Sequence, residues 1–219
     1  MASQNVKRYT VGEEIFNSVS HGVSALGAVV GCSVMVTLAA CFGNATAVVS
    51  ALVFGLSLII MYTMSTLYHA FPFEKVKKLF RVFDHSSIPL LIAGSYTPFC
   101  LIALNGNIKG RIVVTVVWLC AIVAITLNVI NLDRFEKINL ILYIAMGWAV
   151  VFALKDIITA LPEKGFILLT AGGIAYTAGI LFYKMTKIRY MHSVWHLFVT
   201  AGSLLHFLCV IMYVLPMTY

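Results

Sequence analysis

Two histidines open the last long apolar stretch of the chain, in the segment Tyr190-Met191-His192-Ser193-Val194-Trp195-His196. A spacing of four residues puts His192 and His196 on one face of a helix, one turn apart. Two imidazoles so placed can bind one divalent metal ion from a single rigid turn, as in the zinc metalloproteases. The glutamate that follows the first histidine in those enzymes is absent, because position 193 is Ser. The third ligand and any catalytic base must therefore come from elsewhere in the chain.

The composition determines what kind of scaffold holds these histidines. Hydrophobic residues make up 61% of the 219 residues and charged residues only 11%, with a mean hydropathy of +0.98. Such a chain cannot cover a soluble globule with polar groups, so an integral membrane protein is indicated. The stretches without Asp, Glu, Lys or Arg run from Ile15 to Phe73, His85 to Ile108, Ile112 to Leu132, Ile138 to Leu154, Gly165 to Tyr183 and Tyr190 to Tyr219.

The first of these stretches needs two crossings, with a break at residues 43–46, and each of the others approaches or exceeds the roughly 20 residues that span a bilayer as a helix. The stretches lack the alternating pattern of outer-membrane strands. We therefore predict an all-α, polytopic membrane protein with a bundle of seven transmembrane helices, forming one domain over residues 1–219. Residues 1–20 are predicted to be a cytoplasmic N-terminal segment that contains a short interfacial helix over 11–20.

The distribution of basic residues predicts the orientation. The net charge of +7 can suggest a nucleic-acid partner, but in a membrane protein the position of Lys and Arg matters more than their sum, and no such partner is expected. With seven crossings, one side carries eleven of the fifteen basic residues: Lys7, Arg8, Lys75, Lys77, Lys78, Arg81, Arg134, Lys137, Lys184, Lys187 and Arg189. The predicted topology in the cell membrane has a cytoplasmic N-terminus and an external C-terminus.

Polar residues inside a membrane are energetically costly, and here they gather near one boundary. His69 ends the predicted second helix, Asp84 begins the third, and His192 and His196 begin the seventh. By the count of basic residues, all four lie near the cytoplasmic side. The sequence therefore permits one site built from three helices.

These residues also form an ordered set of motifs. Ser65 precedes His69 by one helical turn, Asp84 stands in the segment Phe83-Asp84-His85-Ser86-Ser87-Ile88-Pro89, and the two late histidines enclose Trp195. In this order, with Asn17 and His21 near the start, the chain resembles the bacterial haemolysin III branch of the progestin and adipoQ receptor family over essentially its whole length.

The resemblance implies a zinc ion held by His69, His192 and His196, with Asp84 and Ser65 near a water bound to the metal. Three imidazoles leave a tetrahedral zinc with one open position, which is typical of a catalytic site. There the pKa of a bound water falls to about 7, and a carbonyl can be polarised. Asp84 can then accept a proton from the water and pass it to a leaving group. Related families are linked to hydrolysis of ceramide-like amides.

Each residue also has a plainer interpretation. A lone histidine at a membrane boundary is commonly an interfacial polar group, Asp84 can pair with Arg81, and Ser65 can bond its own helix backbone. His85 points about 100° away from Asp84 on a helix, and His206 lies roughly 15 Å deeper than His196, so neither suits the same ion. His21 can belong to the surroundings of the site or to the interface.

Three functional hypotheses follow for a protein whose partners are membrane lipids. The first is a zinc-dependent hydrolase of lipid amides or esters, whose substrate enters between helices from the bilayer. The second is a non-enzymatic membrane sensor or regulator with a structural zinc ion. The third is a pore-forming cytolysin, which the name of the family suggests and which no stripe of charge on a helix supports.

Overall fold

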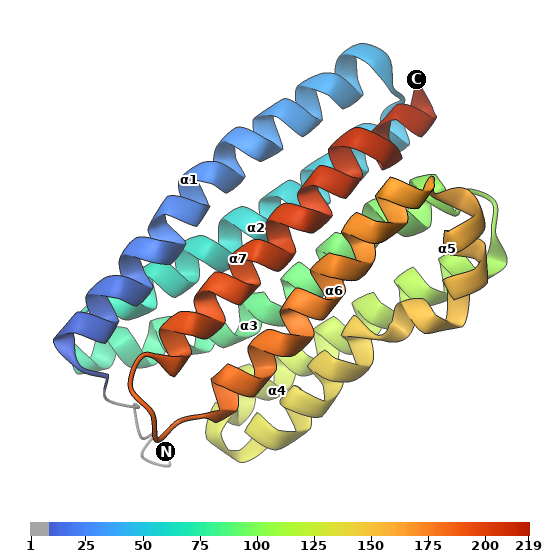
Figure 1. The fold of residues 1–219 in the computed structure, drawn as a ribbon. Helices are drawn as coiled ribbons and strands as arrows, with labels where there is room; N and C mark the ends of the chain where they lie inside the picture. Colours follow the sequence, from blue (N-terminus) through green and yellow to red (C-terminus); the bar gives the residue numbers. More distant parts are fainter. Residues whose placement is uncertain (1–8) are drawn as a thin grey trace.

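The computed structural model describes residues 9–219, and in these residues every regular element is helical (Figure 1). The α-helices are α1 (Val11–Phe42), α2 (Ala45–Ala70), α3 (Glu74–Pro98), α4 (Ile108–Gly147), α5 (Leu154–Ala160), α6 (Glu163–Lys184) and α7 (Met191–Cys209). Short helical turns extend three of them: Phe99–Ala103 after α3, Ala149–Ala153 before α5, and Val210–Val214 with Leu215–Thr218 after α7. The prediction of an all-α fold is confirmed.

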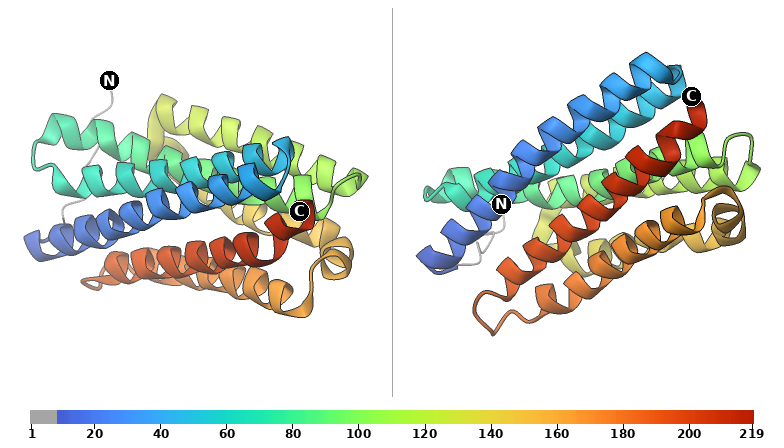
Figure 2. Two further views of the ribbon diagram at one scale, coloured as in Figure 1. Left: turned by 90° about the horizontal axis from the view of Figure 1, so that it is seen from above. Right: turned by 45° about the horizontal axis from the view of Figure 1, so that its top comes forward.

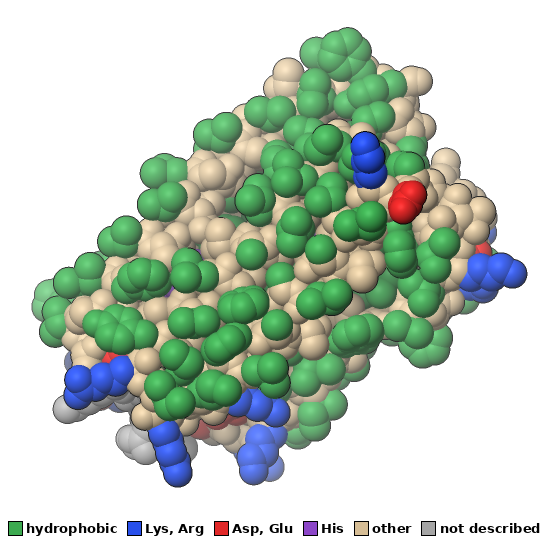
Figure 3. Space-filling model, viewed as in Figure 1, with side chains coloured by type: hydrophobic (Ala, Val, Ile, Leu, Met, Phe, Trp, Pro, Cys, Tyr) green, Lys and Arg blue, Asp and Glu red, His purple; other side chains and the backbone are tan. Residues whose placement is uncertain are grey.

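Six segments are long and apolar enough to cross a membrane. They are Val11–Phe42, Ala45–Ala70, Glu74–Ala103, Ile108–Ala160, Glu163–Lys184 and Met191–Thr218. The face seen in Figure 3 is covered largely by hydrophobic side chains, with Lys and Arg near its two ends. The chain is thus a multi-pass membrane protein. The number of seven crossings and the orientation stay predictions, and Lys7 and Arg8, which enter the charge count, lie outside the described residues.

The longest segment, Ile108–Ala160, turns back on itself at Asn131. This residue has non-helical backbone angles (φ −166°, ψ 96°), and its side-chain oxygen accepts a hydrogen bond from the backbone N–H of Arg134. Asn139 donates to Asn128 over 2.6 Å, although a straight helix would separate residues 11 apart by about 16 Å. α4 therefore has two arms, 108–130 and 132–147, which run in opposite directions in Figure 1.

Two charged runs between the uncharged stretches are helical. Residues 74–81, expected as a loop from their charge, belong to α3, where the pair Glu74–Lys78 (2.8 Å) has the spacing that supports a helix. Residues 133–137, between the stretches that end at Leu132 and begin at Ile138, continue α4 after its single non-helical residue. Residues 11–20 are the first turns of α1, which continues to Phe42.

Glycine permits the closest approach between α1 and α2. A Cβ on Gly55 would lie 2.3 Å from Cys32 Sγ and 3.1 Å from its Cα. The backbone of α2 at Gly55 therefore packs directly against Cys32 of α1. α1 also carries two glycines four residues apart, Gly27 and Gly31. A Cβ on Gly31 would contact the ring of Phe207 at 3.0 Å, whereas one on Gly27 would meet nothing within 4 Å. Gly31 thus serves packing within the bundle.

We expect Gly55→Val to destabilise the bundle by about 1–3 kcal/mol, because the added methyl groups force α1 and α2 apart. The measurement is thermal unfolding of the purified protein in detergent. Gly27→Val is the matched control, since its side chain enters open space, and it should leave the midpoint unchanged. Equal midpoints for the two variants would contradict this account of the contact.

Candidate metal centre

The structure brings together His69, His192 and His196, the three histidines that the sequence predicts as ligands. One ring nitrogen from each lies within 4.8 Å of the others, and the Nε2 atoms of His192 and His196 are 3.2 Å apart. Two nitrogens on one tetrahedral zinc, each at about 2.0–2.1 Å, are themselves about 3.3 Å apart. His69 and His196 are buried and His192 is partly exposed. The donor set therefore fits a divalent metal such as zinc.

Two helices position these histidines. His69 lies at the last turn of α2, and the other two histidines lie on the first two turns of α7. α1 packs against both helices, and it lies beside α7 in both views of Figure 2. The three histidines thus meet at the end of the bundle where α1 and α7 begin (Figure 1).

Glu14 determines which nitrogen of His69 is left for a metal. Its Oε2 lies 2.6 Å from Nδ1 of His69, and since a carboxylate only accepts, Nδ1 carries the proton and donates. Nε2 of His69 then keeps its lone pair, and it is buried without a hydrogen-bond partner. A metal ligand whose other ring nitrogen donates to a carboxylate is the usual arrangement at metal centres.

Aromatic rings enclose the histidines on two sides. Tyr9 stacks on His192 with centroids 4.9 Å apart and meets His69 edge-on at 5.6 Å. Burial raises the pKa of Tyr9 far above its usual range, so its phenol stays protonated at neutral pH. On the opposite side His21 lies parallel to His196, with centroids 3.6 Å apart. His21 therefore belongs to the surroundings of the cluster, which is one of the two placements that the sequence permits.

Ser65 and Asp84, the predicted catalytic residues, are both buried. Ser65 lies one turn before His69 on α2, and its Oγ has no hydrogen-bond partner. Asp84 lies on α3 with Oδ2 3.7 Å from Nδ1 of His85. Arg81, the alternative partner for Asp84, pairs with Asp133 at 2.7 Å. The catalytic roles of Ser65 and Asp84 stay predictions.

The two histidines excluded from the ligand set make backbone hydrogen bonds. The Nδ1–H of His85 donates to the carbonyl of Arg81 (2.9 Å). His206 donates through Nε2 to the carbonyl of Leu169 on α6 (3.2 Å), which joins α7 to α6. Both residues line a large cavity.

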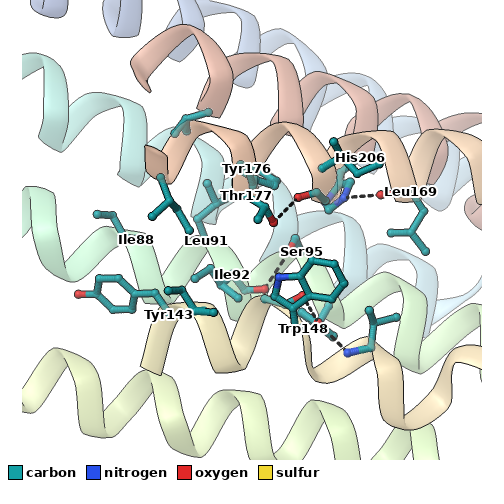
Figure 4. A pocket seen from close by; sticks show the side chains of 18 of the residues that line it. Ile88, Leu91, Ile92, Ser95, Tyr143, Trp148, Leu169, Tyr176, Thr177 and His206 are labelled. Carbon is teal, nitrogen blue, oxygen red and sulfur yellow. Dashed lines mark hydrogen bonds between the residues drawn. The ribbon is translucent and has the colours of Figure 1, made fainter. Parts of the chain in front are cut away.

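This larger cavity has a volume of about 440 Å³ and lies between α3, α4, α6 and α7. Most of its lining is apolar, with Ile88, Leu91 and Ile92 on one wall and Tyr176, Thr177 and His206 on another (Figure 4). The lining also includes Tyr183 and Trp195, whose rings lie 6.1 Å and 5.1 Å from that of His192. A long apolar ligand could thus lie directly beside the histidine cluster.

A smaller, polar pocket of about 190 Å³ lies on the other side of Tyr183. His192, Tyr9, Lys187 and Arg189 are among the residues that line it. Tyr183 lines both the pocket and the cavity, and His192 faces the pocket. Tyr183 therefore separates the apolar cavity from the polar pocket that His192 lines.

Glu14 and Tyr9 were not predicted from the sequence as part of the site. A signal for Glu14 was present, because Glu14, Asn17 and His21 recur at helical spacing and form a polar stripe on an otherwise apolar helix. Thr10 and Glu13 also have the spacing of a capping box, and the structure forms both of its hydrogen bonds. Neither pattern could indicate that the stripe faces α2 and α7.

Comparison with known proteins gives consistent results. The sequence model of a family described as "Haemolysin-III related" matches residues 9–207. Hemolysin-3 of Bacillus cereus is 42% identical over 206 residues, which cover 94% of each chain. The hemolysin-3 homolog of Bacillus subtilis (strain 168) is 38% identical over 94% of this chain and 96% of its own length. The human monocyte to macrophage differentiation factor is 24% identical over 90% of this chain and 83% of its own.

Proposed function

Because the chain belongs to the haemolysin-III related family and carries a three-histidine cluster beside an apolar cavity, we propose that it is a zinc-dependent hydrolase of lipid amides or esters. The observation that carries the proposal is that His192 of the cluster lines a polar pocket, and that Tyr183, which lines the same pocket, also lines the apolar cavity. A histidine cluster, a polar pocket or an apolar cavity alone suits other functions. The three side by side suit an amphiphilic substrate.

The topology proposed for the protein has seven crossings, with the two arms of α4 counted separately. The reversal at Asn131 supports this count, because the second arm leads the chain back along the first. With an odd number of crossings, the N-terminus and the start of α7 share one side. The excess of Lys and Arg assigns that side, and with it the histidine cluster, to the cytoplasm.

In the proposed mechanism, the three histidines hold zinc, which when bound would polarise the substrate carbonyl and activate a water. Asp84 accepts a proton from the attacking water. It returns the proton to the nitrogen or oxygen of the leaving group as the bond to the acyl carbon breaks. Ser65 orients the water through its unpaired Oγ. The acyl chain occupies the larger cavity, whose lining excludes water from the reacting groups.

Release of fatty acid from lipid mixtures by the purified protein in detergent tests this proposal. The release should stop on treatment with a chelator and return on addition of zinc. A protein that contains zinc but releases no fatty acid from any lipid amide or ester would contradict the proposal. The metal would then act as a clamp between α2 and α7, as in a non-enzymatic sensor.

The third hypothesis, a pore, has weaker support. The name hemolysin-3 belongs to the two Bacillus relatives. In this chain the lining of the larger cavity is mostly apolar, which does not suit a water-filled channel. Ion flux through liposomes that contain the purified protein would favour a pore over a hydrolase.

The cavity can be filled without disturbing the histidines. Gly173 lines it from α6, and a Cβ there would meet nothing within 4 Å, so Gly173→Phe places a ring in the cavity. We expect hydrolysis of long-chain substrates to fall about tenfold, which corresponds to about 1.4 kcal/mol of lost binding, while zinc content is unchanged. Gly27→Phe on α1, equally unhindered, should have no effect on hydrolysis. Unaltered hydrolysis in Gly173→Phe would exclude the cavity as the chain site.

A further inference from the structure

The first two turns of α1 contact both helices that carry the histidine ligands. On α2 the contact is Glu14 to His69, at 2.6 Å. On the side of α7, Glu13 accepts a hydrogen bond from the backbone N–H of Tyr190 (2.8 Å), and Asn17 accepts one from the hydroxyl of Ser193 (2.6 Å). Ser193 immediately follows His192, so these contacts hold α7 next to a ligand.

Glu14 is itself held in place by a cation. Nζ of Lys77 on α3 lies 2.8 Å from Oε1 of Glu14, while Oε2 accepts from His69, and Lys77 also donates to the carbonyl of Tyr68. Only 18% of the Glu14 side chain is exposed. With both oxygens engaged, the carboxylate fixes the ring orientation of His69 and keeps the proton on Nδ1.

The start of α7 depends on α1 because it lacks a cap of its own. Tyr190, the residue before α7, has a left-handed backbone (φ 62°), which is unfavourable for a residue with a side chain, and its side chain makes no capping hydrogen bond. The carboxylate of Glu13 accepts its N–H instead, and a negative charge at this position also suits the helix dipole. A Cβ on Gly12 would lie 2.7 Å from the Tyr190 hydroxyl, so the tip of this side chain also contacts the first turn of α1.

We propose that the first two turns of α1 assemble the metal centre, with Glu14 as the positioning residue of His69, and with Glu13 and Asn17 holding α7 where His192 and His196 meet it. This inference rests on the metal-binding part of the proposed function and not on hydrolysis. It assigns to the N-terminal end of α1 a task beyond anchoring the chain in the membrane.

The first test is the zinc affinity of Glu14→Gln. The purified full-length protein in detergent is freed of metal by dialysis against a chelator, and its affinity for zinc is measured by competition with a zinc-binding fluorescent indicator. Gln keeps the size of the side chain but weakens the bond to His69, so affinity should fall about 10- to 100-fold. The visible absorption of the cobalt-loaded variant should also differ from that of the wild type, because the geometry of a ligand has changed.

A matched control separates positioning from a general effect of removing a carboxylate. Glu74→Gln makes the same change on α3, where it breaks an exposed pair with Lys78. This variant should bind zinc within about threefold of the wild type. The inference is overturned if Glu14→Gln binds zinc as tightly as the wild type, or if Glu74→Gln loses as much affinity. A wild type that binds no zinc would instead refute the proposed function.

A matched pair of variants tests the contact between α1 and α7. Ser193→Ala removes the bond to Asn17, whereas Ser203→Ala removes a bond of the same helix to Tyr176, away from the histidines. Zinc affinity should fall about three- to tenfold in Ser193→Ala and stay unchanged in Ser203→Ala. Equal affinities for these two variants would limit the role of α1 to Glu14. Thermal unfolding of the metal-free proteins checks that each variant is folded.

Discussion

His196→Ala should remove zinc from the purified protein, from about one ion per chain in the wild type to nearly none. Only His69 and His192 would remain, on separate helices, and two imidazoles do not suffice for a tight zinc site. Elemental analysis of the protein, purified in detergent without added chelator, measures this directly. The expected loss is nearly complete because His196 is buried within the cluster and its Nε2 lies 3.2 Å from that of His192.

His206→Ala is the control for His196→Ala. His206 is a buried histidine of the same helix, but its Nε2 donates to the carbonyl of Leu169 and it lies roughly 15 Å deeper by helical rise. Its loss should leave the zinc content unchanged. If the wild type contained no zinc after gentle purification, or if His196→Ala retained it, the cluster would be an assembly of buried polar side chains and the hydrolytic mechanism would have no basis.

Asp84→Asn should keep zinc but lower the rate of lipid hydrolysis about 10²- to 10⁴-fold, since the amide has the shape of the carboxylate but cannot accept a proton. Zinc content and fatty-acid release are measured on the same preparation. Asp156→Asn, which affects a pair with Lys109 away from the histidines, should retain full activity. Hydrolysis at the wild-type rate in Asp84→Asn would remove Asp84 from the mechanism, whatever the role of the metal.

The three histidines of the cluster could be placed near one membrane boundary because ionisable residues are rare in apolar helices, and the family resemblance implied that they bind one metal ion. His69, His192 and His196 each stand at the end of a long uncharged stretch, so their positions along the membrane followed from the helix ends alone. The residues that orient them could not be predicted in the same way. Glu14 lies in a segment that reads equally well as an interfacial helix, and its contact with His69 depends on how α1 rotates against α2.

The connections were predicted least well. A basic run such as residues 74–81 reads as a loop when charge alone is considered, yet its Lys and Glu residues favour a helix and extend α3 by two turns. The separate stretches Ile112 to Leu132 and Ile138 to Leu154 predicted a reversal between them, but not that one non-helical residue, Asn131, is enough for it. Asn139 donates a hydrogen bond to Asn128 across the reversal, a contact that only the folded chain reveals.

The bond between Ser193 and Asn17 joins residues 176 positions apart, and its consequence concerns biogenesis. A nascent chain that has inserted α1 through α6 possesses His69 and Glu14 but neither of the other two histidines of the cluster. The cluster can form only after the final helix has entered the bilayer and packed against the first. If the cluster holds zinc as proposed, metal occupancy of this protein in a cell membrane would report completed insertion, and a chain released before α7 would be unable to retain the ion.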